Sequence, residues 1–149
     1  MATDKPRDPV AFRFFNEIGI IEQLARTRFD HVLPEAMTVA QFSVLNHFVR
    51  LGGERSLVDL ARAFQVSKPA MGKLVQRLEA QGFLSLRSNP EDNRSKLVSI
   101  TARGKTAREA AIEALMPELA RMQRALGSEI LSTTLPNLSR VRQWLDENR

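Results

Sequence analysis

The stretch from Ser56 to Ile100 constrains the fold more than any other part of this 149-residue chain. Its first part carries apolar residues at helical spacing, at positions 57, 60, 61 and 64. A two-residue link, positions 65–66, separates this part from Ser67, whose hydroxyl suits the cap of a second helix running to about Gln81. Pro69 falls in the first turn of that helix, where proline is tolerated. Two short helices joined by so tight a turn predict a helix-turn-helix unit.

After Gly82 the spacing of the apolar residues changes from helical to alternating. Apolar residues at positions 83, 84 and 86, and again at 97, 98 and 100, flank the polar stretch 87–96. This arrangement predicts two strands joined by a long loop that contains Asn89-Pro90 and Asp92-Asn93. A hairpin directly after the second helix of a helix-turn-helix is a wing. We therefore expect a mainly α fold with a small β-hairpin wing, a winged helix-turn-helix.

Long helices are expected on both sides of this winged unit. Asp8 and Pro9 suit the start of the first, with Asp8 as the capping side chain, and an apolar stripe follows from position 10 to 32. Thr38 and Gln41 form a capping-box pattern for the second helix, whose apolar residues at 42, 45, 48 and 49 should point inward. Thr101 should cap a further long helix, and a last helix should follow position 127.

The two longest helices, of about 24 residues each, would each span about 36 Å. A compact chain of this length has a diameter of about 38 Å, so the winged unit is too small to cover apolar stripes of that length. We expect the terminal helices of two chains to bury one another in a symmetric homodimer. The predicted organisation is an N-terminal dimerisation helix (residues 1–36), a winged helix-turn-helix DNA-binding region (37–101) and C-terminal dimerisation helices (102–149), within a single structural domain.

Basic residues concentrate in the winged unit. The window 62–105 holds nine lysines and arginines against three acids, a net charge of +6, whereas the whole chain carries +5. A basic segment on an otherwise balanced chain is typical of a surface that binds a polyanion such as double-stranded DNA. An ordinary solvated surface is the alternative.

The helix expected at 67–81 should hold the domain with an apolar face and present its polar face to the major groove of DNA. Glutamine can bond adenine edges, arginine and lysine can bond guanine edges, and all three can hold phosphates, so these roles stay open. Ser67 should cap the helix, and a phosphate contact could coexist with that role. The expected apolar face consists of Ala70, Leu74, Val75 and Leu78. The expected DNA-binding residues of this helix are Ser67, Lys68, Pro69, Lys73, Gln76 and Arg77.

The wing supplies a second group of candidate DNA contacts. An arginine at the hairpin tip, Arg94, suits a narrow minor groove, where the negative potential is enhanced. Asp92 should accept backbone N–H bonds or pair with a neighbouring arginine, with a simple turn residue as the alternative. The expected DNA-binding residues of the wing are Arg87, Asp92, Arg94 and Lys96.

Other function classes find little support in the sequence. Without cysteine the chain has no disulfide, thiolate metal site or thiol redox sensor. No catalytic or cofactor-binding motif occurs, so we expect neither an enzyme nor a cofactor. His31 and His47 do not form a metal site; they could line a cleft for a small-molecule effector or be ordinary polar helix residues. No apolar run nears the roughly 20 residues that span a bilayer, and Met1–Pro9 lacks a secretion signal, so we expect a cytoplasmic protein without a membrane partner.

Taken together, these motifs resemble the MarR family of bacterial transcriptional regulators, over essentially the whole chain. The resemblance rests on the run Asp92-x-Arg94-x-x-x-Val98-x-Ile100-Thr101-x-x-Gly104, directly after Leu78-Glu79-Ala80-Gln81-Gly82-Phe83-Leu84. It implies a winged-helix dimer, joined by its first and last helices, that binds palindromic operators and often releases DNA when a small ligand occupies a cleft between lobes. It also implies that Arg94 is the wing-tip residue in the minor groove. Gly72 departs from the family pattern, because relatives commonly carry a hydroxyl residue there, and this puts one phosphate or base contact in doubt.

The leading hypothesis is a sequence-specific, ligand-responsive regulator, a repressor, that binds a palindromic operator as a homodimer. The second hypothesis is a winged-helix module that docks an acidic protein or organises DNA without sequence preference. A third, an enzyme acting on a small aromatic compound, lacks a catalytic constellation. Preference for one duplex over random DNA separates the first two hypotheses.

Overall fold

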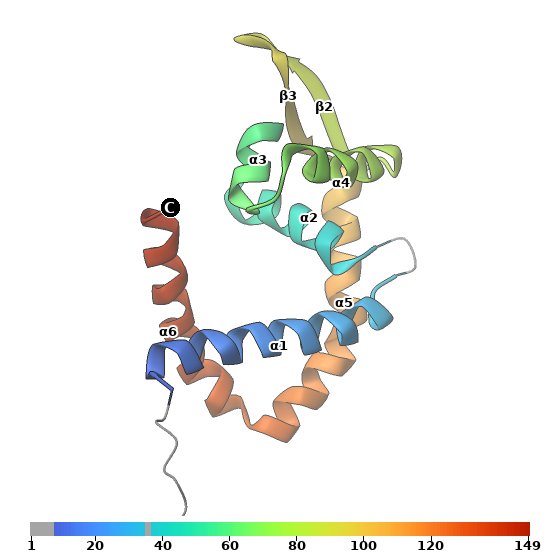
Figure 1. Ribbon diagram of the computed structural model, residues 1–149. Helices are drawn as coiled ribbons and strands as arrows, with labels where there is room; N and C mark the ends of the chain where they lie inside the picture. The colour runs from blue at the N-terminus through green and yellow to red at the C-terminus, as the bar shows by residue number, and fades with distance from the viewer. Residues whose placement is uncertain (1–7, 35–36) are drawn as a thin grey trace, which may run out of the picture. The chain divides into compact units, whose positions relative to one another are not determined.

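The computed structural model describes residues 8–34 and 37–149. Positions 1–7, where the sequence predicts no secretion signal, and positions 35–36 lie outside the described residues. The chain divides into two compact units, residues 1–112 and 113–149, and each is described by itself. The elements run in the order α1 (Val10–Val32), α2 (Val39–Leu51), β1 (Arg55–Ser56), α3 (Leu57–Ala63), α4 (Lys68–Ala80), β2 (Leu84–Asn89), β3 (Asp92–Ile100), α5 (Ala102–Leu126) and α6 (Ser128–Glu147) (Figure 1).

Polar side chains cap the N-termini of several of these helices. The Thr38 hydroxyl accepts the backbone N–H of Gln41, and the Gln41 side chain accepts that of Thr38, which confirms the capping box of α2. Ser67 caps α4 as predicted, and Ser56 caps α3 in the same way. The predicted cap at Asp8 is wrong. Pro9, with extended backbone (ψ 142°), is the last residue before α1, and no side chain caps this helix.

The core of the first unit lies between α2, α3, α4 and the base of the sheet. Two details of the predicted core are wrong: Val49 is 40% exposed, and Ala70 is exposed while Met71 is fully buried. Met71 is the residue that shares a helix face with Val75 and Leu78, at spacings of four and three, whereas Ala70 lies about 100° away around the helix. The largest of the fully buried side chains are Val44, Leu45, Phe48, Leu60, Met71, Val75, Leu78 and Val98.

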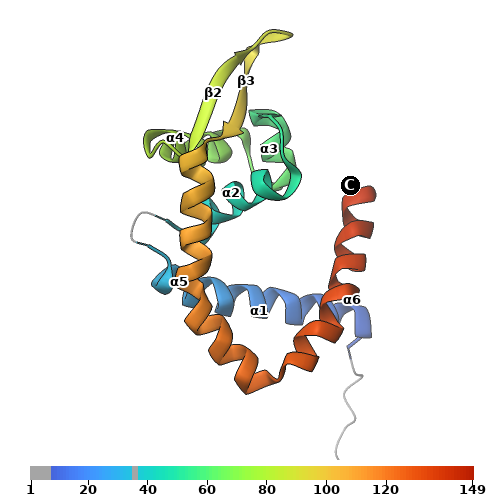
Figure 2. The same ribbon diagram turned by 180° about the vertical axis from the view of Figure 1, so that it is seen from behind.

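The strands form one antiparallel sheet in the order β1-β3-β2. β2 pairs with β3 from Leu84↔Ile100 to Asn89↔Asp92, with an irregularity next to Ser88. The long loop predicted over 87–96 is therefore wrong, because only positions 90–91 separate the two strands. Both faces of this part of the hairpin are largely exposed, so polar residues fill it and no alternation of apolar residues identified it as strand. In Figures 1 and 2 the hairpin extends beyond α3 and α4 as a wing.

Long helices flank the winged part of the chain, as predicted, and many of their apolar residues are exposed in the described part of the chain. α1 has 23 residues and none of them is buried; Phe15 is 50% and Ile21 60% exposed. α6, in the second unit, also has no buried residue, and it continues through Pro136. Its exposed apolar residues recur at helical spacing and include Leu131, Leu135, Leu138 and Leu145.

Candidate nucleic-acid interface

One face of α4 presents the polar residues that the sequence assigns to DNA. Met71, Val75 and Leu78 hold the opposite face in the core and are each 1% exposed or less. With 100° between successive residues, Lys73 and Gln76 point away from that core. All six predicted contacts of this helix are exposed: Ser67, Lys68, Pro69, Lys73, Gln76 and Arg77.

The turn between α3 and α4 sets how this face is presented. Gln65 adopts a left-handed conformation (φ 54°), which is uncommon for a residue other than glycine. Its side-chain amide donates to the Arg62 carbonyl at 2.8 Å, and the Val66 N–H donates to the Ala61 carbonyl at 3.0 Å. The Ser67 hydroxyl then accepts the Ala70 N–H at 3.2 Å and starts α4. The hydroxyl of Ser67 therefore has a structural role irrespective of any contact with phosphate.

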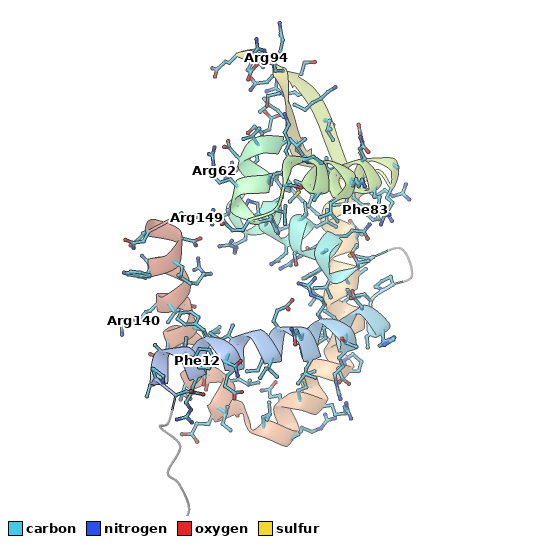
Figure 3. The ribbon with its side chains drawn as sticks, in the orientation of Figure 1. Phe12, Arg62, Phe83, Arg94, Arg140 and Arg149 are labelled. Atoms are coloured by element: carbon cyan, nitrogen blue, oxygen red, sulfur yellow. The ribbon has the colours of Figure 1, made fainter. Side chains whose placement is uncertain are left out.

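The tip of the wing is shaped by two short side chains that bond the backbone. The Asp92 carboxylate accepts the N–H of Arg94 at 3.0 Å, and the Asn89 side chain accepts the N–H of Glu91 at 3.0 Å. Of the roles predicted for Asp92, the backbone contact is the one observed. Figure 3 shows Arg94 at the far end of the wing, and Arg94 and Lys96 are both exposed. A long cationic side chain is thus placed where the wing reaches farthest.

Arg87, the third basic residue predicted to contact DNA from the wing, has a protein partner. Its Nε donates to Glu54 Oε1 at 2.9 Å and its Nη2 donates to Glu54 Oε2 at 2.7 Å, a two-point ion pair. The hydrogen bond from Arg87, together with its charge, lowers the pKa of the Glu54 carboxyl, although partial desolvation opposes the shift. The pair is therefore ionised at neutral pH.

The base of the wing is joined to α5 by Thr101 and Gly104. The Thr101 hydroxyl donates to the Gly82 carbonyl at 2.6 Å and accepts the Gly104 N–H at 2.9 Å. The Thr101 N–H donates to the Phe83 carbonyl at 3.1 Å. Gly104 is buried, and a β-carbon there would lie 2.1 Å from the Phe83 carbonyl oxygen. Glycine is therefore required at this close approach of α5 to the start of β2.

The two histidines differ in their exposure and in their surroundings. His31 is exposed in the last turn of α1. His47 is half-buried, and its ring lies 5.3 Å from the ring of Phe64 at the end of α3, as expected of a packing residue. A hollow of about 440 Å³ next to the end of α2 is lined by Phe48, Val49 and Lys105, among others, and by neither histidine. A role for His31 or His47 in effector binding stays a prediction.

Neither a metal-binding cluster nor a membrane-spanning helix occurs in the described residues. Over residues 8–34 and 37–149, no group of three or more His, Asp or Glu side chains is arranged to hold a metal ion. Within the same part of the chain, no helix has the length and apolarity needed to cross a membrane.

The helix glycine that departs from the family pattern, Gly72, has room around it. A β-carbon at this position would find its nearest neighbour, Leu57 Cδ2, at an ordinary contact distance of 3.9 Å. The backbone of α4 thus accepts a side chain here, so the absence of the hydroxyl does not reflect a steric limit.

Sequence reasoning missed Glu54 as the partner of Arg87. The two residues are 33 positions apart, and Glu54 precedes a strand of only two residues, so neither spacing nor periodicity could have indicated the pair. It also missed Asn46 in α2, whose side-chain oxygen accepts two bonds from Arg108 of α5, at 3.2 and 3.0 Å.

Comparison with known proteins agrees with this geometry. Residues 37–95, from the start of α2 into the wing, match the sequence model of the MarR family. The transcriptional activatory protein BadR of Rhodopseudomonas palustris is 31% identical over 94 residues, which are 62% of this chain. The chain spans about half of BadR, 54% of its length.

Solved structures extend the similarity to nearly the whole chain. The transcriptional regulator BldR from Sulfolobus solfataricus superposes with a TM-score of 0.70 and 26% identity, over 87% of this chain and 95% of BldR. Wild-type MarR from E. coli superposes with a TM-score of 0.73 and 24% identity, over 92% of this chain and 98% of MarR. Residues 37–95 thus match the sequence model of the MarR family, and the chain as a whole has the winged-helix fold of these solved transcriptional regulators.

Proposed function

We propose that this protein is a homodimeric, sequence-specific transcriptional regulator that inserts α4 into the major groove of a palindromic operator and reaches the adjacent minor groove with Arg94. The observation that carries the proposal is the exposure of Lys73, Gln76 and Arg77 on one side of a helix whose opposite side is fixed in the core. A basic helix face of this kind, fixed by the core behind it, can bond base edges and phosphates of DNA. AbfR, which shares this fold with a TM-score of 0.63 and 22% identity, has been crystallised bound to DNA.

Dimerisation is supported by the uncovered apolar residues of the terminal helices. α1 and α6 have no buried residue, yet Ile21 is 60% and Leu135 63% exposed. Monomeric soluble proteins rarely expose large contiguous apolar patches, so a second copy of the chain is the proposed cover. Two copies of α4 in a dimer would read half-sites about 34–36 Å apart, one turn of the duplex.

The second part of the proposal is that the protein is a repressor controlled by a small-molecule ligand. PcaV from Streptomyces coelicolor, with a TM-score of 0.68 and 17% identity, has been crystallised with its natural ligand. We propose that a small molecule likewise releases this chain from its operator in the cytoplasm. BadR is named an activatory protein, so the direction of control is tested separately, by transcription in vitro with and without the protein.

Competition binding tests the central proposal and separates it from an unspecific DNA-organising module. A fluorescein-labelled duplex, selected from a random pool, is titrated with the protein at about 0.15 M salt. A specific regulator prefers this duplex over random DNA by about a thousandfold or more. Equal displacement of the label by selected and random duplexes would contradict the proposal and favour the module.

A further inference from the structure

The ion pair between Glu54 and Arg87 lies where the wing leaves the body of the domain. In the sheet order β1-β3-β2, Glu54 precedes β1 at one edge and Arg87 belongs to β2 at the other, so the pair bridges the two edges across β3. Leu97 of β3 pairs with Ser56 on one side and with Arg87 on the other. Among the described residues, this is the last row of the sheet that has three strands. Closer to the tip only β2 and β3 remain paired.

Beyond that row the wing is a two-stranded ribbon, residues 88–96, which we call the arm. A two-stranded hairpin alone is marginally stable in water, so the direction of the arm depends on what fixes its base. β1 contributes only two residue pairs to β3, Arg55↔Val98 and Ser56↔Leu97. The Glu54–Arg87 pair adds two hydrogen bonds with fixed fork geometry at this place.

The distance from this base to the tip makes the direction of the arm important. Arg94 is three residues from Leu97 along β3, about 10 Å at the rise of an extended strand. A tilt of about 10° at the base would therefore move the backbone at Arg94 by nearly 2 Å. A shift of that size is enough to remove a hydrogen bond between a side chain and DNA.

We infer that Arg87 is a positioning residue, which with Glu54 fixes the direction of the arm so that Arg94 reaches the minor groove, and that it is not itself a DNA contact. This inference rests on the proposed function. It revises the role that the sequence predicts for Arg87. The two-point bond to the carboxylate occupies the Nε–Nη2 edge of the guanidinium, one of the two edges through which an arginine can bind a phosphate.

The charge of Glu54 allows the two roles of Arg87 to be separated by experiment. Glu54→Gln removes a negative charge from the winged unit, so electrostatics alone would leave DNA binding unchanged or strengthen it. If the pair positions the arm, the same substitution weakens binding. We expect Glu54→Gln to lose operator affinity by about fivefold or more. Arg87→Gln should lose at least as much, because it also removes a positive charge, and the double variant should lose no more than Arg87→Gln alone, because all three lack the same ion pair.

The matched control is Glu109→Gln on the exposed side of α5, which changes the net charge equally and should leave operator affinity unchanged. Each variant is first shown to melt at the wild-type temperature. If Glu54→Gln binds the operator as tightly as the wild type, or more tightly, while Arg87→Gln binds weakly, Arg87 is a DNA contact and the inference is overturned.

A second measurement needs no DNA and so separates this inference from the proposed function. The chain has no cysteine, so spin labels can be attached at Asn93→Cys in the wing and Val58→Cys in α3, in dimers diluted with unlabelled chain. We expect Glu54→Gln to broaden the distance distribution between the labels, and Glu109→Gln to leave it unchanged. An identical distribution with and without the Glu54 carboxylate would overturn the inference even if the protein proves to be a specific regulator.

Discussion

The same substitution, glycine to alanine, should have opposite effects on stability at the two glycines of α4 and α5. At Gly104 the new β-carbon would lie 2.1 Å from the Phe83 carbonyl oxygen and 2.9 Å from Ile100 Cγ1. Carbon and carbonyl oxygen ordinarily meet at about 3.3 Å or more, so the backbone of α5 or of β2 must move by about 1 Å. The Phe83 carbonyl cannot rotate away freely, because it accepts the Thr101 N–H.

Inserting a methyl group into such a packed site costs about 1–3 kcal/mol, and more where both partners are backbone. We expect Gly104→Ala to lower the free energy of unfolding by about 3 kcal/mol, at the upper end of that range because the clash is with backbone. At 2–4 °C for each kcal/mol, the Tm should fall by about 6–12 °C. Gly72→Ala meets only Leu57 Cδ2 at 3.9 Å, so the gain in helix propensity, about 1 kcal/mol, should raise the Tm by about 2–4 °C.

Thermal melts and urea titrations at one protein concentration measure both variants, since the stability of a dimer depends on concentration. Gly72→Ala serves as the matched control for the chemistry of the substitution. A Gly104→Ala protein that melts at or above the wild-type temperature would refute the reasoning, because the close approach of α5 to β2 would then not exist.

Four further outcomes are expected. Arg94→Ala should lower operator affinity by about tenfold or more, about 1.4 kcal/mol, in a gel-shift titration, while light scattering still shows a dimer. Gly72→Ser should restore the hydroxyl of the family pattern and tighten operator binding several-fold in the same titration; no change would mean that the hydroxyl does not reach the DNA. Leu138→Glu should convert the dimer to a monomer in light scattering, because it buries a charge in the proposed interface. Thr38→Ala should cost about 1 kcal/mol of unfolding free energy in urea, since α2 loses its cap, and a smaller loss than 0.5 kcal/mol would argue against the capping box.

The helix-turn-helix could be predicted because independent signals agree at the same residues. Ser67 caps α4, Pro69 is tolerated in its first turn and the apolar spacing marks its buried face. The error at Ala70 and Met71 has a simple origin: both are apolar, and only the phase of the helix against its neighbours decides which one is buried. The exposed face of α4, where the candidate contacts lie, was still predicted correctly.

The wing was harder to predict because it lacks the signal on which strand prediction depends. Positions 87–96 are polar on both faces, and a strand without a buried face shows no alternation. β1 is too short for any pattern, and the contact that fixes Arg87 comes from Glu54, 33 positions away. Long-range pairing between exposed charges leaves no local trace in one sequence, so only the structure could reveal it.

Hydroxyl-radical footprinting of a selected operator tests the central claim most directly. The account predicts two related protected half-sites whose centres lie one or more helical turns apart, with flanking minor-groove protection that disappears in Arg94→Ala. A single unpaired footprint, or flanking protection that persists without the Arg94 side chain, would contradict the account of a dimer that reads DNA with α4 and the wing.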